Sequence, residues 1–340
     1  MPVGRTASQR VALEEIVLSS QIKTLEEFIE IRKLLEASQL IQAAMSTGVL
    51  SALSVGQKTA AEICQHVGLD LSAVTLLVDS LIHVGVLEKY DLYYALSPAA
   101  KMLPTDGMDK CWTHLDEYLR TGESLARRVD LPDTDRTFEI DQARDQWMRT
   151  PSAMDAATAL NFGKSRRGLR VLEIGCGSGI FSATLAHRDP DSTFVLMDSL
   201  ENLALAKATV ESIELAPQFE YAESEDLFPG SEIGGFDLVL LTGQLHQRSS
   251  EWFAQWCKQI RDLIHVDGEL VLADVFGGQE KGECNLAFYA MQIGLRTERG
   301  QLHSPASIKV MLETGGYGQV QFAHLPSPPF TWGLVVAARD

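Results

Sequence analysis

The chain has 340 residues, 45% of them hydrophobic and 22% charged, and its formal net charge of -17 repels nucleic-acid backbones and anionic membrane surfaces. The five cysteines are an odd number and lack the spacing of metal ligands, which favours a reducing compartment and no bound metal. The sequence shows neither the apolar core of a signal peptide nor a stretch that could span a membrane. These features predict a cytoplasmic protein of two domains, with no nucleic-acid partner and no membrane partner.

The first hundred residues predict several helices followed by a small hairpin. Thr24 with Glu27, and Thr59 with Glu62, form capping-box signatures that mark helix starts. Residues 71–83 predict a further helix, and β-like runs at 86–90 and 92–96 predict the two strands of the hairpin. Helix, turn, helix and hairpin form the outline of a winged helix.

A winged helix can place its second helix in the major groove of DNA, but the charge of this helix argues against that function. Residues 71–87, LSAVTLLVDSLIHVGVL, contain no Lys or Arg to neutralise phosphates or to read guanine. Their Leu and Val residues favour a buried surface or a subunit interface. We therefore expect a module for packing and dimerisation.

The segment 106–165 has a polar helical pattern that is broken by prolines. It carries large apolar side chains that are candidates for a pocket taking a flat, apolar molecule, namely Trp112, Trp147, Met148 and Met154. The alternative for any one of them is a place in the core between two domains.

Residues 170–180, RVLEIGCGSGI, predict a buried strand, a tight loop and the start of a helix. Gly175, Gly177 and Gly179 let the loop adopt positive φ and let a ligand approach bare backbone, although such loops also occur for structural reasons alone. The dinucleotide fingerprint requires a glycine where Ile180 stands. Glu173, two residues before the first glycine, suits a cationic ligand better than a pyrophosphate.

From residue 170 onward, strand-like and helix-like segments alternate, which predicts an α/β domain with a mostly parallel sheet covered on both faces. Ligands of such sheets bind outside the carboxyl ends of the strands. In this sequence the predicted strands end at or near polar residues. These are Glu173, Asp198, Asp226, the stretch 242–246 and Asp274. Their convergence on one edge predicts the functional site.

Two acids in this set have alternative interpretations. Asp198 lies 19 residues after Gly179, which is the distance expected for an acid that binds ribose hydroxyls. The alternative is that Asp198, with Ser199 following it, is the N-cap of a helix. Asp226, in the acidic stretch ESEDLF, is either a ligand contact or a solvated acid.

Together these features resemble the class I S-adenosylmethionine-dependent methyltransferases. The order of the domains is similar to that of the small-molecule O-methyltransferases related to the plant caffeic acid and hydroxyindole enzymes. The resemblance covers nearly the whole chain and implies three parts: a winged-helix dimerisation domain at 1–105, a helical bridge lining the acceptor pocket at 106–165, and a Rossmann-like seven-stranded catalytic domain at 166–340. It also implies a homodimer formed through the N-terminal domain, and S-adenosylmethionine as cofactor with S-adenosylhomocysteine as product.

The resemblance assigns roles to individual residues. Those expected to bind the cofactor are Glu173, Gly175, Gly177, Gly179, Asp198, Ser199, Asp226, Leu227 and Thr242. Those expected to contact the acceptor are Trp112, Trp147, Met148, Met154, Phe288, Met291 and Gln292. Asp226 and Leu227 match part of the family's Gly-Asp-x-Phe motif, with Glu225 in place of its glycine, and there the acid binds the adenine amine.

His246 matches the family's general base, and Asp274 matches the first of two acids that hold it. The second acid would fall near Leu302, where none stands, unless Glu298 substitutes for it. Residues 247, 248 and 250 depart from the family's motif after the histidine.

The resemblance predicts transfer of a methyl group to a hydroxyl of an aromatic or otherwise conjugated small molecule. The alternatives are methylation of carbon or nitrogen by the same fold, and a non-enzymatic winged-helix regulator that senses a metabolite.

Overall fold

The computed structural model describes residues 7–103, 110–127, 142–224, 227, 234–277, 284–327 and 332–339. The chain divides into two compact units, Met1–Lys110 and Cys111–Asp340, each of which is described by itself. The expected bridge at 106–165 falls mostly within the second unit, and the division into three parts stays a prediction.

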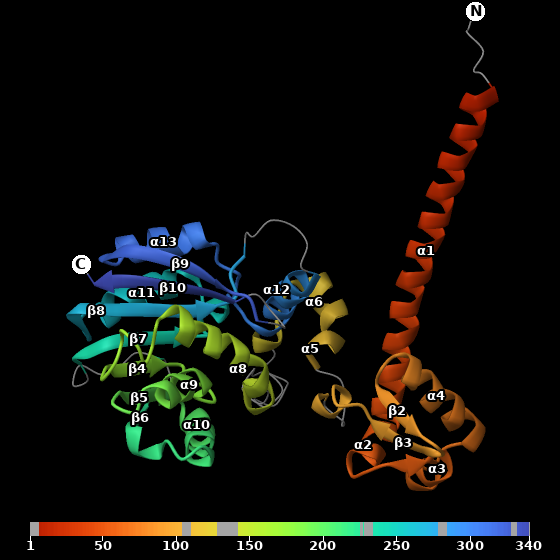
Figure 1. Ribbon diagram of the computed structural model, residues 1–340, viewed down its shortest axis with the longest axis horizontal. Coiled ribbons are helices and arrows are strands. Elements are labelled where there is room, and N and C mark those ends of the chain that lie inside the picture. The colour runs from red at the N-terminus through yellow and green to blue at the C-terminus, as the bar shows by residue number, and fades with distance from the viewer. Residues whose placement is uncertain are drawn as a thin grey trace, which may run out of the picture. The chain divides into compact units, whose positions relative to one another are not determined.

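The first unit contains four helices and a small sheet in its described residues (Figure 1). The helices are α1 (Ala7–Ser46), α2 (Val49–Ser54), α3 (Ala60–Val67) and α4 (Leu71–His83). The antiparallel strands β1 (Lys58–Thr59), β2 (Leu87–Tyr90) and β3 (Tyr93–Leu96) have the order β1-β3-β2. The predicted helix pair and hairpin are therefore confirmed, and Thr59 forms the predicted capping box with Glu62.

The helix start predicted at Thr24 is wrong, because α1 runs through this position without a break. No glycine or proline interrupts residues 7–46, so the helix has no residue that would stop it. The capping-box pattern at Thr24 therefore lies inside a single 40-residue helix.

No single helix among the described residues is both long enough and apolar enough to cross a membrane. The bent pair α3 and α4 passes the test of length and composition only when the two are taken together.

The second unit is built on a seven-stranded sheet with the order β6-β5-β4-β7-β8-β10-β9 (Figure 1). The five strands β4 (Arg170–Ile174), β5 (Thr193–Asp198), β6 (Phe219–Glu223), β7 (Phe236–Thr242) and β8 (Ile264–Asp274) run parallel. The strands β9 (Tyr317–Leu325) and β10 (Trp332–Arg339) pair antiparallel at the end of the sheet, and β10 also pairs antiparallel with β8.

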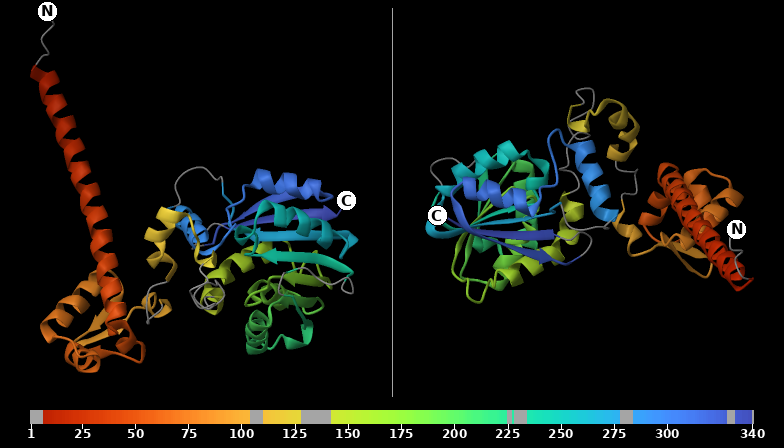
Figure 2. Two further views of the ribbon diagram at one scale, coloured as in Figure 1. Left: turned by 180° about the vertical axis from the view of Figure 1, so that it is seen from behind. Right: turned by 90° about the horizontal axis from the view of Figure 1, so that it is seen from above.

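Two layers of helices cover the sheet (Figure 2). The helices α8 (Gln142–Ala159), α9 (Ile180–Arg188) and α10 (Leu200–Ser212) share one apolar core with the sheet, and α11 (Ser250–Arg261) and α13 (Pro305–Thr314) share another. The described residues also form the helices α5 (Lys110–Thr113), α6 (Leu115–Thr121) and α12 (Cys284–Arg296). They form 3₁₀ turns at Ala100–Met102, Leu125–Arg127, Ala216–Gln218 and Leu245–Gln247.

The central strands alternate between the two cores. In β4, Val171 packs into the first core while Leu172 and Ile174 pack into the second. Because successive side chains of a strand point to opposite faces, a sheet covered on both sides needs apolar residues at every position. This explains why the strand segments are continuously apolar and confirms the predicted α/β class.

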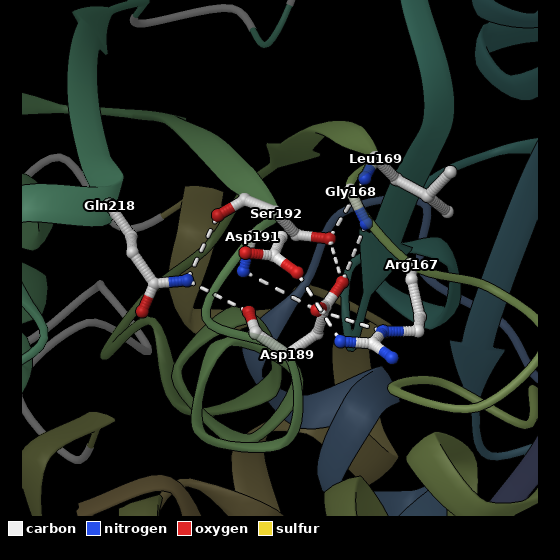
Figure 3. Close-up of polar contacts among 7 residues, drawn as sticks. All are labelled: Arg167, Gly168, Leu169, Asp189, Asp191, Ser192 and Gln218. Atoms are coloured by element: carbon white, nitrogen blue, oxygen red, sulfur yellow. Dashed lines mark hydrogen bonds and ion pairs between the residues drawn. The ribbon is translucent and has the colours of Figure 1, made fainter.

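A polar cluster fixes the amino ends of β4 and β5, on the edge opposite the strand carboxyl ends (Figure 3). Asp189, which is fully buried, accepts hydrogen bonds from Gly168 N at 2.8 Å and from Ser192 Oγ at 2.5 Å. The Gln218 amide donates to the carbonyl oxygens of Asp189 and Ser192, both at 2.9 Å. Burial opposes ionisation of Asp189, but the hydrogen bonds to its carboxylate and the charge of Arg167 outweigh burial and lower the pKa of the carboxyl, so the cluster is a structural clamp.

Candidate functional site

The carboxyl ends of β5, β4, β7 and β8 lie side by side, and each presents a polar residue. Asp198 ends β5, Glu173 lies one residue before the end of β4, Thr242 ends β7 and Asp274 ends β8. Because the four strands are parallel neighbours, these side chains come to one edge of the sheet, as the sequence predicts.

The glycine loop follows β4 and turns the chain sharply into α9. Gly175, Gly177 and Gly179 have φ values of 68°, 53° and 70°, in the left-handed region that disfavours other residues. A Cβ atom on Gly175 would lie 2.5 Å from Gln244 Cγ, and the Gln244 side chain donates to Gly175 O at 3.2 Å. The first glycine is therefore required both by its backbone and by the close approach of Gln244.

Asp198 connects the glycine loop to the start of α10. Its Oδ2 accepts from Gly177 N at 2.8 Å, and its Oδ1 accepts from Ser199 N at 2.8 Å and from Asn202 Nδ2 at 2.9 Å. Ser199 is the residue that caps α10, through a bond from Asn202 N to its side chain. A carboxylate offers about four acceptor positions. Three are used within the described residues, so Asp198 retains capacity for one more donor.

Glu173 is the most deeply buried acid of the site, with 0% of its surface exposed. Its two oxygens accept from Ser182 N at 3.1 Å and from Thr242 Oγ1 at 2.6 Å. Burial raises the pKa of Glu173, because desolvation outweighs the hydrogen bonds that favour its charged form. A positive charge nearby would relieve this cost.

His246 lies in the 3₁₀ turn after β7, is 2% exposed, and is held by Asp274. Its Nδ1 lies 2.6 Å from Asp274 Oδ1, and the same carboxylate accepts the backbone N–H groups of Leu245, His246 and Val275. Four donors favour an ionised carboxylate, which can only accept, so Nδ1 of His246 carries a proton and Nε2 is the basic atom. This is the arrangement that a general base requires.

A residue that the sequence does not point to, Tyr289 on α12, also contacts His246. Its hydroxyl lies 2.9 Å from His246 Nε2, and the two rings are 5.2 Å apart at a tilt of 55°. No local pattern marks Tyr289, since it lies 43 residues from His246 along the chain.

The substitute acid considered for His246 is not used in that way. Glu298 forms an ion pair with Arg127, with Oε1 at 2.8 Å from Nε. The hypothesis that Glu298 holds His246 is therefore wrong, and Asp274 is the acid that the described residues bring to the imidazole.

The expected cofactor residues that follow the third strand, β6, lie partly outside the described residues. Asp226 is not described. Leu227 is buried in the second core at a φ of 61°, and its carbonyl accepts from Trp256 Nε1 at 3.1 Å.

The expected acceptor contacts are spread over three helices. Phe288 and Met291, on α12, are 57% and 37% exposed, and Gln292 beside them is half-buried. Met148 is half-buried and Met154 is exposed on α8, whereas the side chain of Trp147 lies outside the described residues. Trp112 packs against Cys111, Leu125 and Leu295. Among the side chains that the structure describes, the expected acceptor residues on α12 share their helix with Tyr289, which contacts His246.

No group of three or more His, Cys, Asp or Glu side chains that could hold a metal ion is present in the described part of the chain.

Comparisons with known proteins agree with this fold. Residues 171–268 match the methyltransferase domain family. The 3-hydroxy-5-methyl-1-naphthoate 3-O-methyltransferase of Streptomyces sahachiroi is 22% identical over 312 residues, which are 86% of this chain and 89% of that protein. The structure of mitomycin 7-O-methyltransferase has a TM-score of 0.74 at 19% identity and covers 95% of this chain and 100% of its own. Human N-acetylserotonin methyltransferase, solved with S-adenosylmethionine, has a TM-score of 0.68 at 16% identity, with 100% of both chains covered.

Proposed function

We propose that this chain is an S-adenosylmethionine-dependent small-molecule O-methyltransferase that methylates a hydroxyl of an aromatic or conjugated small molecule, with His246 as general base. The observation that carries the proposal is the buried Asp274–His246 pair, whose Nε2 is left as the basic atom beside the glycine-loop edge of the sheet.

The residues of the edge fit the cofactor. Glu173 is a buried carboxylate whose raised pKa a cationic ligand would counter, and Asp198 keeps one acceptor position for a ribose hydroxyl. The glycine loop leaves bare backbone between these two acids. We assign Gly177, Gly179, Ser199, Asp226 and Leu227 to the same site by their place in the family motifs.

When bound, S-adenosylmethionine supplies a methyl group on a cationic sulfur. The chain's part is to align the acceptor and to remove its proton. Alignment can supply up to about 7–11 kcal/mol in favourable cases, and a general base typically adds about 10²–10⁴-fold. The base is needed because a phenol with a pKa near 10 is largely protonated at neutral pH, whereas an ordinary imidazole with a pKa near 6.5 can accept its proton. Asp274 keeps the imidazole in the correct tautomer and stabilises the imidazolium that forms.

An aromatic acceptor is supported by exposed apolar side chains on α12. Phe288 and Met291 are exposed on the helix that carries Tyr289, so a flat ring could cover them. The relative from Streptomyces sahachiroi is named for a hydroxyl on a naphthoate ring.

We also propose a homodimer formed through the first unit. Large apolar side chains along α1 are 42–72% exposed within the chain, namely Ile22, Leu25, Phe28, Ile29, Ile31, Leu34 and Leu35. A second copy of this helix would cover such a surface. A cytoplasmic location is proposed from the composition and from the free cysteines among the described residues.

The proposed function is tested by incubating the full chain with S-adenosylmethionine and a panel of phenolic, indolic and naphtholic acceptors. Mass spectrometry should show the gain of one methyl group on a hydroxyl and the release of S-adenosylhomocysteine. Methylation confined to carbon or nitrogen would contradict the proposed acceptor. Binding of DNA without any methylation would support a regulator instead.

A further inference from the structure

The basic nitrogen of His246 already has a partner within the chain. Nδ1 donates to Asp274, so Nε2 accepts the hydrogen bond from the Tyr289 hydroxyl at 2.9 Å. The imidazole is only 2% exposed. An acceptor hydroxyl therefore cannot reach Nε2 directly while Tyr289 stays in place.

We propose that Tyr289 is a catalytic residue that passes the acceptor's proton to His246. The inference rests on the proposed function and deepens it, since it names the group that faces the acceptor. The tyrosine takes the side of His246 opposite Asp274, so the imidazole is held between a carboxylate and a phenol rather than between two acids.

The packing of Tyr289 favours a relay over a removable cover. Its ring is half-buried, packs against the first core of the second unit and contacts the ring of His246. Swinging it away would break the hydrogen bond and expose apolar surface of both rings. An acceptor that bonds to the hydroxyl of Tyr289 avoids both costs.

The acidities of the groups also suit a relay. An ordinary tyrosine phenol and a phenolic acceptor both have a pKa near 10, so moving a proton between them costs little free energy. The uphill part is the transfer to the imidazole, and Asp274 opposes that cost by stabilising the imidazolium.

The proton balance is simple. The Tyr289 hydroxyl gives its proton to Nε2 of His246, and the acceptor hydroxyl gives its proton to the Tyr289 oxygen. The acceptor oxygen forms its bond to the methyl carbon as the carbon–sulfur bond breaks, and the electron pair of that bond stays on sulfur. Tyr289 ends the step neutral, and His246 later releases its extra proton to solvent.

The test compares Tyr289→Phe with wild type on two probes, in the full chain at neutral pH. The first probe is 1-naphthol, which is protonated, and the second is 4-nitro-1-naphthol, which is already ionised and needs no base. The relay predicts that Tyr289→Phe lowers the turnover of 1-naphthol by about 10²-fold or more but leaves that of the nitro compound close to wild type. His246→Ala should show the same difference between the probes.

The matched control is Tyr317→Phe. This substitution also removes a buried tyrosine hydroxyl, which donates to Cys257 O at 3.0 Å. Tyr317 lies on β9, which is four strands away from β4 in the sheet order. Its effect should be the same for both probes.

Two results would overturn the relay. An unchanged or faster turnover of 1-naphthol by Tyr289→Phe would make the tyrosine a cover, and an equal loss on both probes would make it a structural support. Failure of wild type on both probes would count instead against the proposed function. A readout independent of turnover is the ¹⁵N resonance of His246 Nε2, which should shift in Tyr289→Phe while that of Nδ1 stays; an unchanged Nε2 resonance contradicts the contact.

Discussion

Replacing Asp274 with asparagine should destabilise the second unit by about 3–6 kcal/mol. The carboxylate accepts four hydrogen bonds, from Leu245 N at 2.8 Å, His246 N at 3.3 Å, His246 Nδ1 at 2.6 Å and Val275 N at 2.6 Å. Each oxygen takes two of them. Asparagine keeps one oxygen and turns the other into an NH₂ group that faces two donors, so two bonds to a charged group are lost at about 1.5–3 kcal/mol each.

The loss is large against the 5–15 kcal/mol typical of domain stability, so it is easily measured. All five tryptophans lie between residues 112 and 332, within the second unit, so their fluorescence reports urea unfolding of this unit alone. The control is Asp237→Asn, where an exposed site accepts one bond from Arg170 N at 2.8 Å and the expected loss is about 1 kcal/mol or less. A loss in Asp274→Asn no larger than in the control would refute the reasoning.

Three further predictions concern other parts of the molecule. Glu173→Gln should raise or preserve the melting temperature at neutral pH, because the raised pKa of Glu173 means that its ionised carboxylate destabilises the folded state. The amide of the variant can still bond to Ser182 N and to the Thr242 hydroxyl. Calorimetry should show at least about tenfold weaker binding of S-adenosylhomocysteine to this variant. Asp189→Asn should lower the free energy of unfolding by about 1–3 kcal/mol at neutral pH. The pKa of Asp189 is lowered in the folded state, so its stabilisation is lost as the pH falls below the ordinary value of 3.8 and through the folded pKa. Urea titrations should therefore show that the variant and wild type become equally stable over this pH range. Phe28→Glu should change the stability of the folded monomer by no more than about 0.5 kcal/mol, because Phe28 is 58% exposed. It should convert the proposed dimer to monomer in sedimentation experiments, and a dimer that persists would place the interface elsewhere.

Much of the second unit could be predicted from the sequence because its signals are local. The continuously apolar strands reflect burial on both faces of the sheet, and the glycine spacing reflects three positive φ values in one loop. The convergence of Glu173 and Asp198 follows from parallel topology alone, since it needs only the positions of the strand ends.

Contacts between distant segments could not be predicted in the same way. The hydroxyl of Tyr289 meets His246 across 43 residues, and Glu298 meets Arg127 across 171. No spacing rule connects such positions, so the sequence does not reveal that Glu298 pairs with Arg127. The opposite error occurred at Thr24, where a local capping pattern was overridden by a helix that has no breaker.

The central claim, that His246 is the general base, is tested most directly by His246→Ala. Turnover of a neutral phenol should fall by about 10²–10⁴-fold. Binding of S-adenosylhomocysteine should stay unchanged, because the expected cofactor residues lie on the neighbouring strand ends. Turnover equal to that of wild type, in a variant that still binds S-adenosylhomocysteine, would contradict the account.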